Sequence, residues 1–296
     1  MKPAARREVV HYTMATHGFS QRRACGLIRM SRSSFAYSSQ KRPDAEMRER
    51  LRTLAGQRPR YGYRRLHVLM GREGHVVNHK RLYRIYREEG LAVRRRRRKR
   101  LAASARQPMT TPSQVNERWS MDFTSDTLAD GRPFRTLNVV DDFSRECLVL
   151  EVDTSLPGLR VVRVLDRLAA ERSCPKAIVI DNGPEFTGKA LDAWAYRRGV
   201  QLQFIRPGKP VENAFIESFN GKFRDECLNE HWFTGLSDAR FTIEAWRRDY
   251  NLVRPHSSLG GMTPADFARR SAGLRSATPP SDPQIAKKKG INGLSL

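Results

Sequence analysis

Three acidic residues in the second half of the chain are placed so that they could serve one reaction. Asp122 lies in the segment 119–124, which predicts a strand, and Asp181 directly follows the short apolar run 177–180. Glu217 follows after 35 intervening residues, in a segment whose apolar residues recur with helical spacing. Because sites in open α/β sheets gather beyond the carboxyl ends of strands, the three carboxylates can converge on one edge of a sheet.

Such a group of carboxylates predicts divalent-cation chemistry. Hard oxygen ligands suit Mg²⁺ or Mn²⁺. Two such ions a few ångströms apart favour in-line displacement at a phosphodiester, because one activates the attacking oxygen and the other stabilises the leaving oxygen. The chain has 31 Asp and Glu residues, so spacing alone leaves a second interpretation open, in which Glu217 is a surface residue of an amphipathic helix.

The segments around these residues predict a mixed α/β sheet with helices on both faces. Three strands come first and are typical of an antiparallel meander, since Asp130-Gly131 is a tight-turn signal between the first two. Helices and strands then alternate. Strands are expected at residues 119–124, 134–140, 147–152, 177–180 and 200–205, and helices at residues 159–172, 189–198 and 213–228.

The helix expected from Asn213 has two different stripes. The apolar stripe, which should be buried, consists of Ile216, Phe219, Phe223 and Cys227. The neighbouring polar stripe consists of Asn213, Glu217, Asn220, Gly221 and Arg224. A glycine in that stripe lowers helix propensity but permits the close approach of another chain or a ligand, which favours a functional role for Glu217.

Positive charge is concentrated in the first third of the chain. Residues 1–100 hold 28 Lys and Arg against 7 Asp and Glu, whereas residues 101–296 hold 27 against 24, and the formal net charge is +24. A strongly basic segment joined to a nearly neutral remainder predicts a nucleic-acid-binding region coupled to a second activity. The run expected to contact DNA phosphates is Arg94, Arg95, Arg96, Arg97, Arg98, Lys99 and Arg100.

Two helical units precede this run. Ser20, Ser31 and Asn78 are placed to cap short helices, as in helix-turn-helix modules, although a small helical bundle with a soluble surface would look similar. The outward basic residues expected to meet DNA are Arg64, Arg65, Lys80, Arg81 and Arg84. The domains expected are a helix-turn-helix segment at 1–41, a second helical DNA-binding domain at 42–100, a linker at 101–117, a catalytic core at 118–270 and a disordered tail at 271–296.

Membrane and secreted classes are disfavoured. No run approaches the roughly 18–20 apolar residues that span a bilayer, and the N-terminus lacks the apolar stretch of a signal peptide. The 4 cysteines lie far apart without a C-x-x-C pair, so neither a disulfide framework nor a zinc knuckle is expected. We therefore expect a cytoplasmic, DNA-associated protein with no membrane partner.

The motifs around the three carboxylates resemble those of a known family. Asp122, Asp181 and Glu217 match the D,D(35)E pattern of retroviral-type integrases and many bacterial transposases. The flanking segments match in the same order, at 119–122 (WSMD), 139–145 (VVDDFSR), 181–186 (DNGPEF), 213–221 (NAFIESFNG) and 250–264 (YN, RPH and TP), together with 2–7 (KPAARR) and 61–66 (YGYRRL). To about Arg270 the chain is similar to the OrfB transposase subunit of bacterial insertion sequences.

The resemblance implies an RNase H-like fold for about residues 118–225 and a DNA transposase activity. It implies that Asp122, Asp181 and Glu217 ligate two Mg²⁺ or Mn²⁺ ions. The reaction implied is cleavage of a DNA strand by water, followed by transfer of a 3′-hydroxyl onto another strand. Arg224 resembles the basic position used against the end DNA, and Lys222 is a weaker candidate. The residues implied to support the metal ligands are Asn182, Gly183, Glu185 and Asn213.

The resemblance also implies partners and identifies competing carboxylates. The partners are double-stranded DNA of the element's terminal repeats and of the target, further copies of the chain in a homo-oligomer, and an upstream-frame subunit or fusion. Asp141 and Asp142 are the rival carboxylates, and we interpret them as structural residues of a hairpin. The loop 207–210 resembles the mobile loop that precedes the catalytic helix in this family.

Two other functions stay open on the sequence. One is a catalytically silent DNA-binding regulator of the element, and the other is an RNase H-like nuclease acting on another nucleic acid. The presence of all three acidic residues favours a transposase over the regulator. The integrase-type flanking motifs and the basic N-terminal third favour a transposase over the nuclease.

Overall fold

The computed structural model describes residues 3–37, 44–93, 111–206 and 213–273, and it divides into two units, Met1–Glu49 and Arg50–Leu296. The first unit contains α1 (Pro3–His17), α2 (Gln21–Leu27) and α3 (Arg32–Ala36) around a small core. The predicted caps are confirmed, because Ser20 accepts a hydrogen bond from the backbone N–H of Arg23 and Ser31 accepts one from that of Ser34.

Three helices lead into the second unit. They are α4 (Ala45–Gln57), α5 (Tyr63–Arg72) and α6 (His79–Glu88). The side chain of Asn78 caps α6 as predicted, by accepting a hydrogen bond from the backbone N–H of Lys80. Apolar residues at helical spacing on α5 and α6 are buried, namely Leu66, Leu69, Met70, Leu82, Ile85 and Tyr86. The arginine run 94–100 lies outside the described residues.

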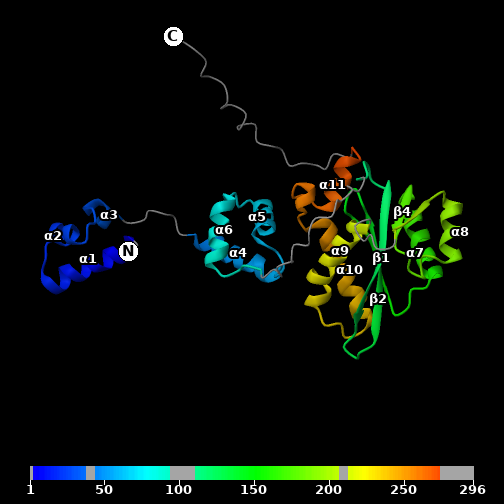
Figure 1. Ribbon diagram of the computed structural model, residues 1–296, viewed down its shortest axis with the longest axis horizontal. Coiled ribbons are helices and arrows are strands. Elements are labelled where there is room, and N and C mark those ends of the chain that lie inside the picture. Colours follow the sequence, from blue (N-terminus) through cyan, green and yellow to red (C-terminus); the bar gives the residue numbers. More distant parts are fainter. Residues whose placement is uncertain (1–2, 38–43, 94–110, 207–212, 274–296) are drawn as a thin grey trace, which may run out of the picture. The chain divides into compact units, whose positions relative to one another are not determined.

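A five-stranded mixed sheet forms the centre of the second unit (Figure 1). Its strands are β1 (Arg118–Thr127), β2 (Pro133–Asp141), β3 (Cys147–Asp153), β4 (Ala177–Ile180) and β5 (Gln201–Phe204). The spatial order is β3-β2-β1-β4-β5, with β1, β2 and β3 antiparallel and with β4 and β5 parallel to β1. The predicted meander and mixed sheet are therefore confirmed.

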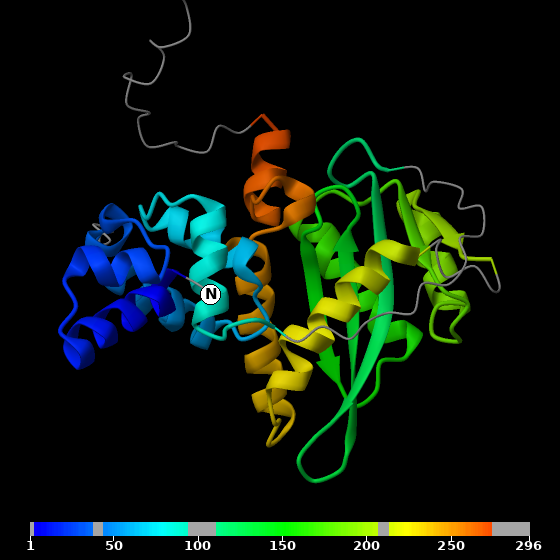
Figure 2. The same cartoon turned by 60° about the vertical axis from the view of Figure 1, so that its left-hand side comes forward.

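Helices cover both faces of this sheet, as the sequence predicts. One face packs against α7 (Gly158–Glu171) and α8 (Lys189–Arg198), around a core that includes Trp119 and Trp194. The other packs against α9 (Ala214–Glu226) and α10 (Leu236–Leu252), and α9 is the yellow helix that crosses the sheet in Figure 2. All four residues of the apolar stripe predicted for α9 are buried. Two short 3-10 helices, η2 (Leu228–Glu230) and η3 (Ser257–Leu259), and α11 (Pro264–Ser271) complete this part.

Residues at the end of the predicted linker contact the sheet. Residues 111–117, assigned to the linker from their composition, are folded against the core where the structure describes them. The backbone N–H of Asn116 donates to Asp141 Oδ2 at 2.8 Å, and the indole of Trp119 donates to Asn116 Oδ1 at 3.1 Å. Composition hides this anchoring because it depends on partners distant in sequence. The rest of the predicted linker and the tail from residue 274 lie outside the described residues.

Candidate active site

The strand register brings Asp122 and Asp181 to the same level of the sheet. β1 and β4 pair in parallel with Ser120 opposite Val179, so Asp122 and Asp181 each lie two residues further along neighbouring strands. β1 continues past this point, whereas β4 ends at Ile180 and leaves Asp181 at its carboxyl end. This is the placement that the sequence predicts for a site at the edge of an α/β sheet.

Helix α9 brings Glu217 to the same place. Asn220, one turn after Glu217, donates its side-chain amide to Asp122 Oδ2 at 2.7 Å, which fixes this part of α9 over β1. Glu217 is exposed on the helix, whereas Ile216 and Phe219 on either side of it are buried. The structure thus brings together the three carboxylates predicted from the sequence.

Asp181 and Glu217 lie close enough to Asp122 for their charges to affect its pKa. Burial, together with the negative charges of Asp181 and Glu217, raises the pKa of Asp122 to about 6. Hydrogen bonds from the backbone N–H of Phe123 and from Asn220 act in the opposite direction. Three acidic groups at one place, one of them with a raised pKa, make a site whose anionic form a bound cation would stabilise.

A buried polar network, which the sequence reasoning missed, orients Asp122. Asn138 on β2 donates its amide to Thr124 Oγ1 at 2.8 Å and to Asn220 Oδ1 at 2.7 Å. Thr136 donates to Asn138 Oδ1 at 2.8 Å. A buried amide needs hydrogen-bond partners. The presence of Asn138 within the apolar segment 137–140 was therefore the sequence signal for a buried polar network. The network fixes the rotamer of Asn220 and, through it, the direction of the Asp122 carboxylate.

The loop after β4 is shaped around Asp181. The backbone N–H of Gly183 donates to Asp181 Oδ1 at 3.0 Å, and a Cβ atom at this position would lie 3.0 Å from the same oxygen. The amide of Asn182 donates to the backbone oxygen of Ile205 at 3.0 Å, which ties the loop to the end of β5. Glu185 is ion-paired with Arg135. Of these three residues, Gly183 contacts Asp181 directly, whereas Asn182 and Glu185 bind other parts of the core.

Asn213, predicted to support the site, lies at the N-cap of α9. It is buried, and no hydrogen-bond partner of its Oδ1 occurs among the described residues. The loop 207–210, predicted to be mobile, lies outside the described residues.

The rival carboxylates Asp141 and Asp142 have structural partners. Asp142 is buried and accepts hydrogen bonds from Arg118 Nε at 2.6 Å and from the hydroxyl of Ser120 at 2.7 Å. Asp141 is also buried and accepts hydrogen bonds from the backbone N–H and hydroxyl of Ser144. Both carboxylates are therefore used within the hairpin, as interpreted from the sequence.

The donor set fits a hard divalent cation, although it is not a closed cage. Asp122, Asp181 and Glu217 offer only carboxylate oxygens, the ligands that Mg²⁺ and Mn²⁺ prefer. Within the described ranges, no group of three or more His, Cys, Asp and Glu side chains is arranged so that it could already hold a metal ion.

The predicted DNA-contacting residues fall into two sets. Exposed ones include Arg64, Lys80, Arg81 and Arg84, of which the last three lie on helix α6 beside the exposed Tyr83, whose ring contacts that of Tyr63. Arg224 is also exposed, and its guanidinium donates to the backbone oxygen of Ser125 at 3.1 Å.

Arg65 and Lys222 are more enclosed. Arg65 contacts Glu226 at 2.8 Å, and Lys222 is half-buried with its Nζ 3.0 Å from the hydroxyl of Ser218. Burial and the positive charge of the neighbouring Arg254 lower the pKa of Lys222 to about 8.

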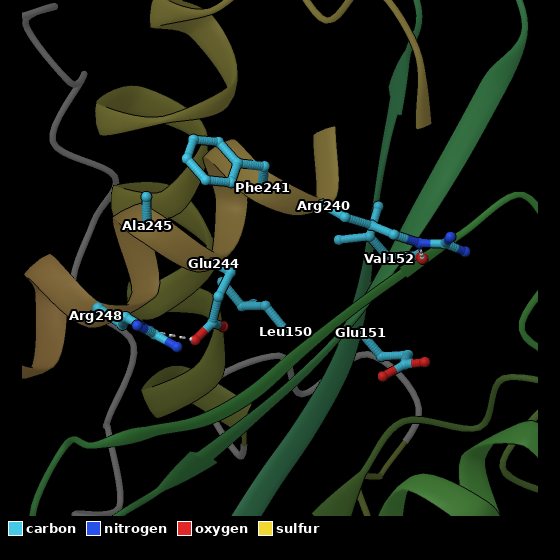
Figure 3. Close-up of a pocket in the computed structure, with 8 residues that line it drawn as sticks. All are labelled: Leu150, Glu151, Val152, Arg240, Phe241, Glu244, Ala245 and Arg248. Carbon is cyan, nitrogen blue, oxygen red and sulfur yellow. Dashed lines mark hydrogen bonds and ion pairs between the residues drawn. The ribbon is translucent and has the colours of Figure 1, made fainter. Parts of the chain in front are cut away.

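A groove of about 630 Å³ lies elsewhere, between β3 and α10 (Figure 3). Its charged residues are paired within the protein. Glu244 binds Arg248, Arg240 donates to the backbone oxygen of Val152, and Glu151 binds arginines of α7. The groove contains none of the three carboxylates of the site.

Comparison with known proteins agrees with this architecture. Models of the integrase core domain match residues 112–210 and 198–264, and a model of an HTH-like domain matches residues 41–99. The uncharacterized 31.7 kDa protein of insertion element IS407 from Burkholderia multivorans is 54% identical over 254 residues, covering 85% of this chain and 91% of the relative. The uncharacterized 39.2 kDa protein of insertion element IS476 from Xanthomonas euvesicatoria is 47% identical over 269 residues, covering 90% and 78%.

More distant relatives extend the comparison. The putative transposase InsK for insertion sequence element IS150 of Escherichia coli is 25% identical, covering 81% of this chain and 90% of the relative. A chain in the structure of a simian T-cell lymphotropic virus intasome in complex with PP2A regulatory subunit B56 gamma aligns with a TM-score of 0.50 at 15% identity, covering 80% of each chain. That structural likeness concerns the fold.

An integrase core behind an HTH-like domain, with three acidic residues converging at the edge of the sheet, defines the DDE-type transposases and integrases, which are polynucleotidyl transferases. Within this class, the chain belongs to the insertion-element transposases with an integrase core. None of the described helices is long and apolar enough to cross a membrane.

Proposed function

We propose that this transposase cleaves the DNA ends of its element in a metal-dependent reaction and joins the freed 3′-hydroxyl to target DNA. The observation that carries this proposal is the convergence of Asp122, Asp181 and Glu217, with the pKa of Asp122 raised to about 6. Such carboxylates are suited to hold cations against phosphodiester oxygens.

Asp122, Asp181 and Glu217 are the residues that would hold two Mg²⁺ or Mn²⁺ ions. When bound, the ions supply activation of the attacking oxygen and stabilisation of the leaving oxygen. The protein contributes by fixing the ligands. Asn220 orients the Asp122 carboxylate, and the N–H of Gly183 holds Asp181. A ligand set held in this way could direct in-line attack by water and later by a DNA 3′-hydroxyl.

The basic surfaces of the chain are suited to double-stranded DNA. The exposed cations of α6 lie on the last of the three described helices in the HTH-like domain and on the second helix of the α5–α6 pair, the position of the helix that enters the major groove in such modules. Arg224 lies two turns after Glu217 on α9, where it can contact the phosphates next to the reacting bond. We therefore assign terminal repeats and target DNA as substrates.

Transposition brings two element ends together, so at least two copies of the chain are expected on DNA. A symmetric homo-oligomer is the usual arrangement for such an assembly. An upstream-frame subunit or fusion partner is a second proposed component, from the resemblance to two-frame insertion sequences. Mixing tagged and untagged chains with terminal-repeat DNA tests the first point, because co-purification requires an oligomer.

A cleavage and strand-transfer assay tests the proposal. The substrate is a labelled duplex of the terminal repeat taken from DNA flanking the gene, incubated with Mg²⁺ or Mn²⁺ and a target plasmid. Wild type should give nicked ends and joined products, and Glu217→Gln should give neither. Asp192→Asn, which neutralises an exposed acidic residue on α8, is the matched control and should keep both products. DNA binding without products would favour the silent regulator, and degradation of an RNA–DNA hybrid would favour the nuclease.

A further inference from the structure

Glu226 connects the catalytic helix to two arginines from other parts of the second unit. Arg254 Nε and Nη2 each donate to one carboxylate oxygen of Glu226 at 2.6 Å, in a bidentate pair. Arg65 Nη1 donates to Oε1 of the same carboxylate at 2.8 Å. The Arg254 side chain is buried and that of Glu226 is nearly so, with exposed fractions of 2% and 8%.

The three residues come from three structural elements. Glu226 is the last residue of α9, the helix that carries Glu217, and Arg254 follows α10. Arg65 lies on α5, within the region that matches the HTH-like domain. One carboxylate therefore joins the catalytic helix, the loop after α10 and the DNA-binding domain.

Further contacts reinforce this junction from the same domain. Arg58 forms a two-pronged pair with Asp249 of α10, and Arg60 binds Glu230. Arg72 donates to the backbone oxygen of Val253 at 2.6 Å. The HTH-like domain thus contacts the core at the C-terminal ends of α9 and α10.

The charges at the junction keep Glu226 ionised. Burial raises the pKa of Glu226, but the hydrogen bonds and charges of Arg254 and Arg65 outweigh it and leave the pKa below its ordinary value. A buried carboxylate that has lost one guanidinium would be poorly compensated, so the pair must keep its geometry. The C-terminal end of α9 is therefore held in a fixed position by both partners.

We propose that Glu226 is a positioning residue that transmits the placement of the DNA-binding domain to the catalytic helix. Terminal DNA bound by α5 and α6 is thereby positioned relative to Glu217, which lies nine residues before Glu226 on α9. This inference rests on the proposed function, since register matters only if Glu217 acts on the bound DNA. The Arg254 pair stabilises α9 inside the core, and the Arg65 contact links the Glu226 carboxylate to the DNA-binding domain.

Arg65→Met isolates the crossing link, because it leaves the Arg254–Glu226 pair intact. Arg50→Met is the matched control. Arg50 forms a comparable two-pronged ion pair with Glu73, but both residues belong to the HTH-like domain. Each variant removes one positive charge of the HTH-like domain together with the ion pair that this charge forms. Only Arg65→Met thereby removes a contact with α9.

The test measures the cleavage rate constant at saturating terminal-repeat DNA, with Mg²⁺, for the full chain. We expect Arg65→Met to lower this rate constant about tenfold relative to Arg50→Met, because small misplacements of reacting groups have large effects on rate. A direct DNA-contacting role for Arg65 would instead raise KM and leave the saturated rate unchanged. Equal saturated rates for the two variants would overturn the proposal.

Two further measurements test the role of the Arg65 contact. Arg65→Lys should recover part of the lost rate, since it restores a charge but not the planar donor geometry. Hydrogen exchange of α9 without DNA should be faster in Arg65→Met than in Arg50→Met, and identical exchange would also contradict the proposal. This arm needs no activity. If wild type shows no cleavage, the proposed function fails, while the exchange result still decides whether the junction fixes α9.

Discussion

The side-chain amide of Asn220 lies 2.7 Å from Asp122 Oδ2, so helix α9 and strand β1 are joined at the carboxylate proposed to bind metal. The other end of that amide accepts a hydrogen bond from Asn138 on β2. Contacts from two strands and one helix therefore fix the direction of the Asp122 carboxylate. In a site that must gather three acidic groups around cations, this preorganisation limits the movement needed on metal binding.

Removing this hydrogen bond should slow the reaction without preventing DNA binding. In Asn220→Ala, Asp122 loses an orienting donor and Asn138 loses a partner, so we expect cleavage with Mg²⁺ to fall by about 10- to 100-fold. Terminal-repeat affinity, measured by a gel-shift titration, should stay within about threefold because the Asn220 amide is already bound to Asp122 and Asn138. Wild-type cleavage by this variant would show that the orientation of Asp122 is set by other contacts.

Neutralising Asp122 should stabilise the metal-free protein at neutral pH. The folded pKa of Asp122, about 6, is above the ordinary value of 3.8. Ionising Asp122 therefore lowers the stability of the folded protein. The cost is absent below pH 3.8, grows between pH 3.8 and 6, and is complete above pH 6. At full value the shift corresponds to about 3 kcal/mol, and solvent screening of this half-buried group reduces the expected effect to about 1–2 kcal/mol.

Thermal unfolding in EDTA measures this effect. Asp122→Asn should have a higher Tm than wild type at pH 7.5, and the difference should be clearly smaller at pH 4.5. Added Mg²⁺ should stabilise wild type more than the variant, because only wild type keeps all three carboxylates. A variant that is less stable than wild type at pH 7.5 would mean that the ionised carboxylate is stabilised by its surroundings.

The buried pair of Arg254 and Glu226 should be costly to break. Arg254→Met leaves Glu226 with Arg65 alone, and loss of one partner of a buried pair typically destabilises a protein by about 3–5 kcal/mol. Urea unfolding measures the loss. Arg269→Met, which breaks an exposed pair with Asp266 on α11, is the control and should change the free energy of unfolding by less than about 1 kcal/mol. Equal effects would remove any special role for the buried pair.

Replacing the seven cations at 94–100 with Gln or Ser should weaken DNA binding and flatten its salt dependence. Each phosphate contact contributes about 0.9 to the slope of log affinity against log salt, because binding releases condensed counterions. We expect a smaller slope in the variant, measured by fluorescence anisotropy on terminal-repeat DNA over a range of KCl concentrations. An unchanged slope would mean that the run does not contact phosphates.

Features that depend on local sequence could be predicted, and those that depend on distant partners could not. The caps Ser20, Ser31 and Asn78 act through backbone groups two or three residues away, and the short apolar strand β4 is legible from its composition. The carboxylates were found through spacing and resemblance. By contrast, the bond from Asn138 to Asn220 joins residues 82 positions apart, and only the packing of α9 on the sheet reveals it.

The basic residues illustrate the same limit. Arg64 and Arg65 are neighbours with equal charge, and sequence reasoning treated them alike. The structure leaves Arg64 exposed, whereas Arg65 turns toward Glu226, 161 positions away. Helical phase alone could not separate them, because the partner helix that covers one side of α5 was unknown.

The central claim is that Asp122, Asp181 and Glu217 act together in metal-dependent strand cleavage. Its most direct test is cleavage of the labelled terminal repeat with Mg²⁺ by three single variants, Asp122→Asn, Asp181→Asn and Glu217→Gln, each at DNA concentrations that saturate binding. We predict that each variant binds the duplex as wild type does and yields no cleaved product. Near-wild-type cleavage by any one of them would contradict the claim for that residue.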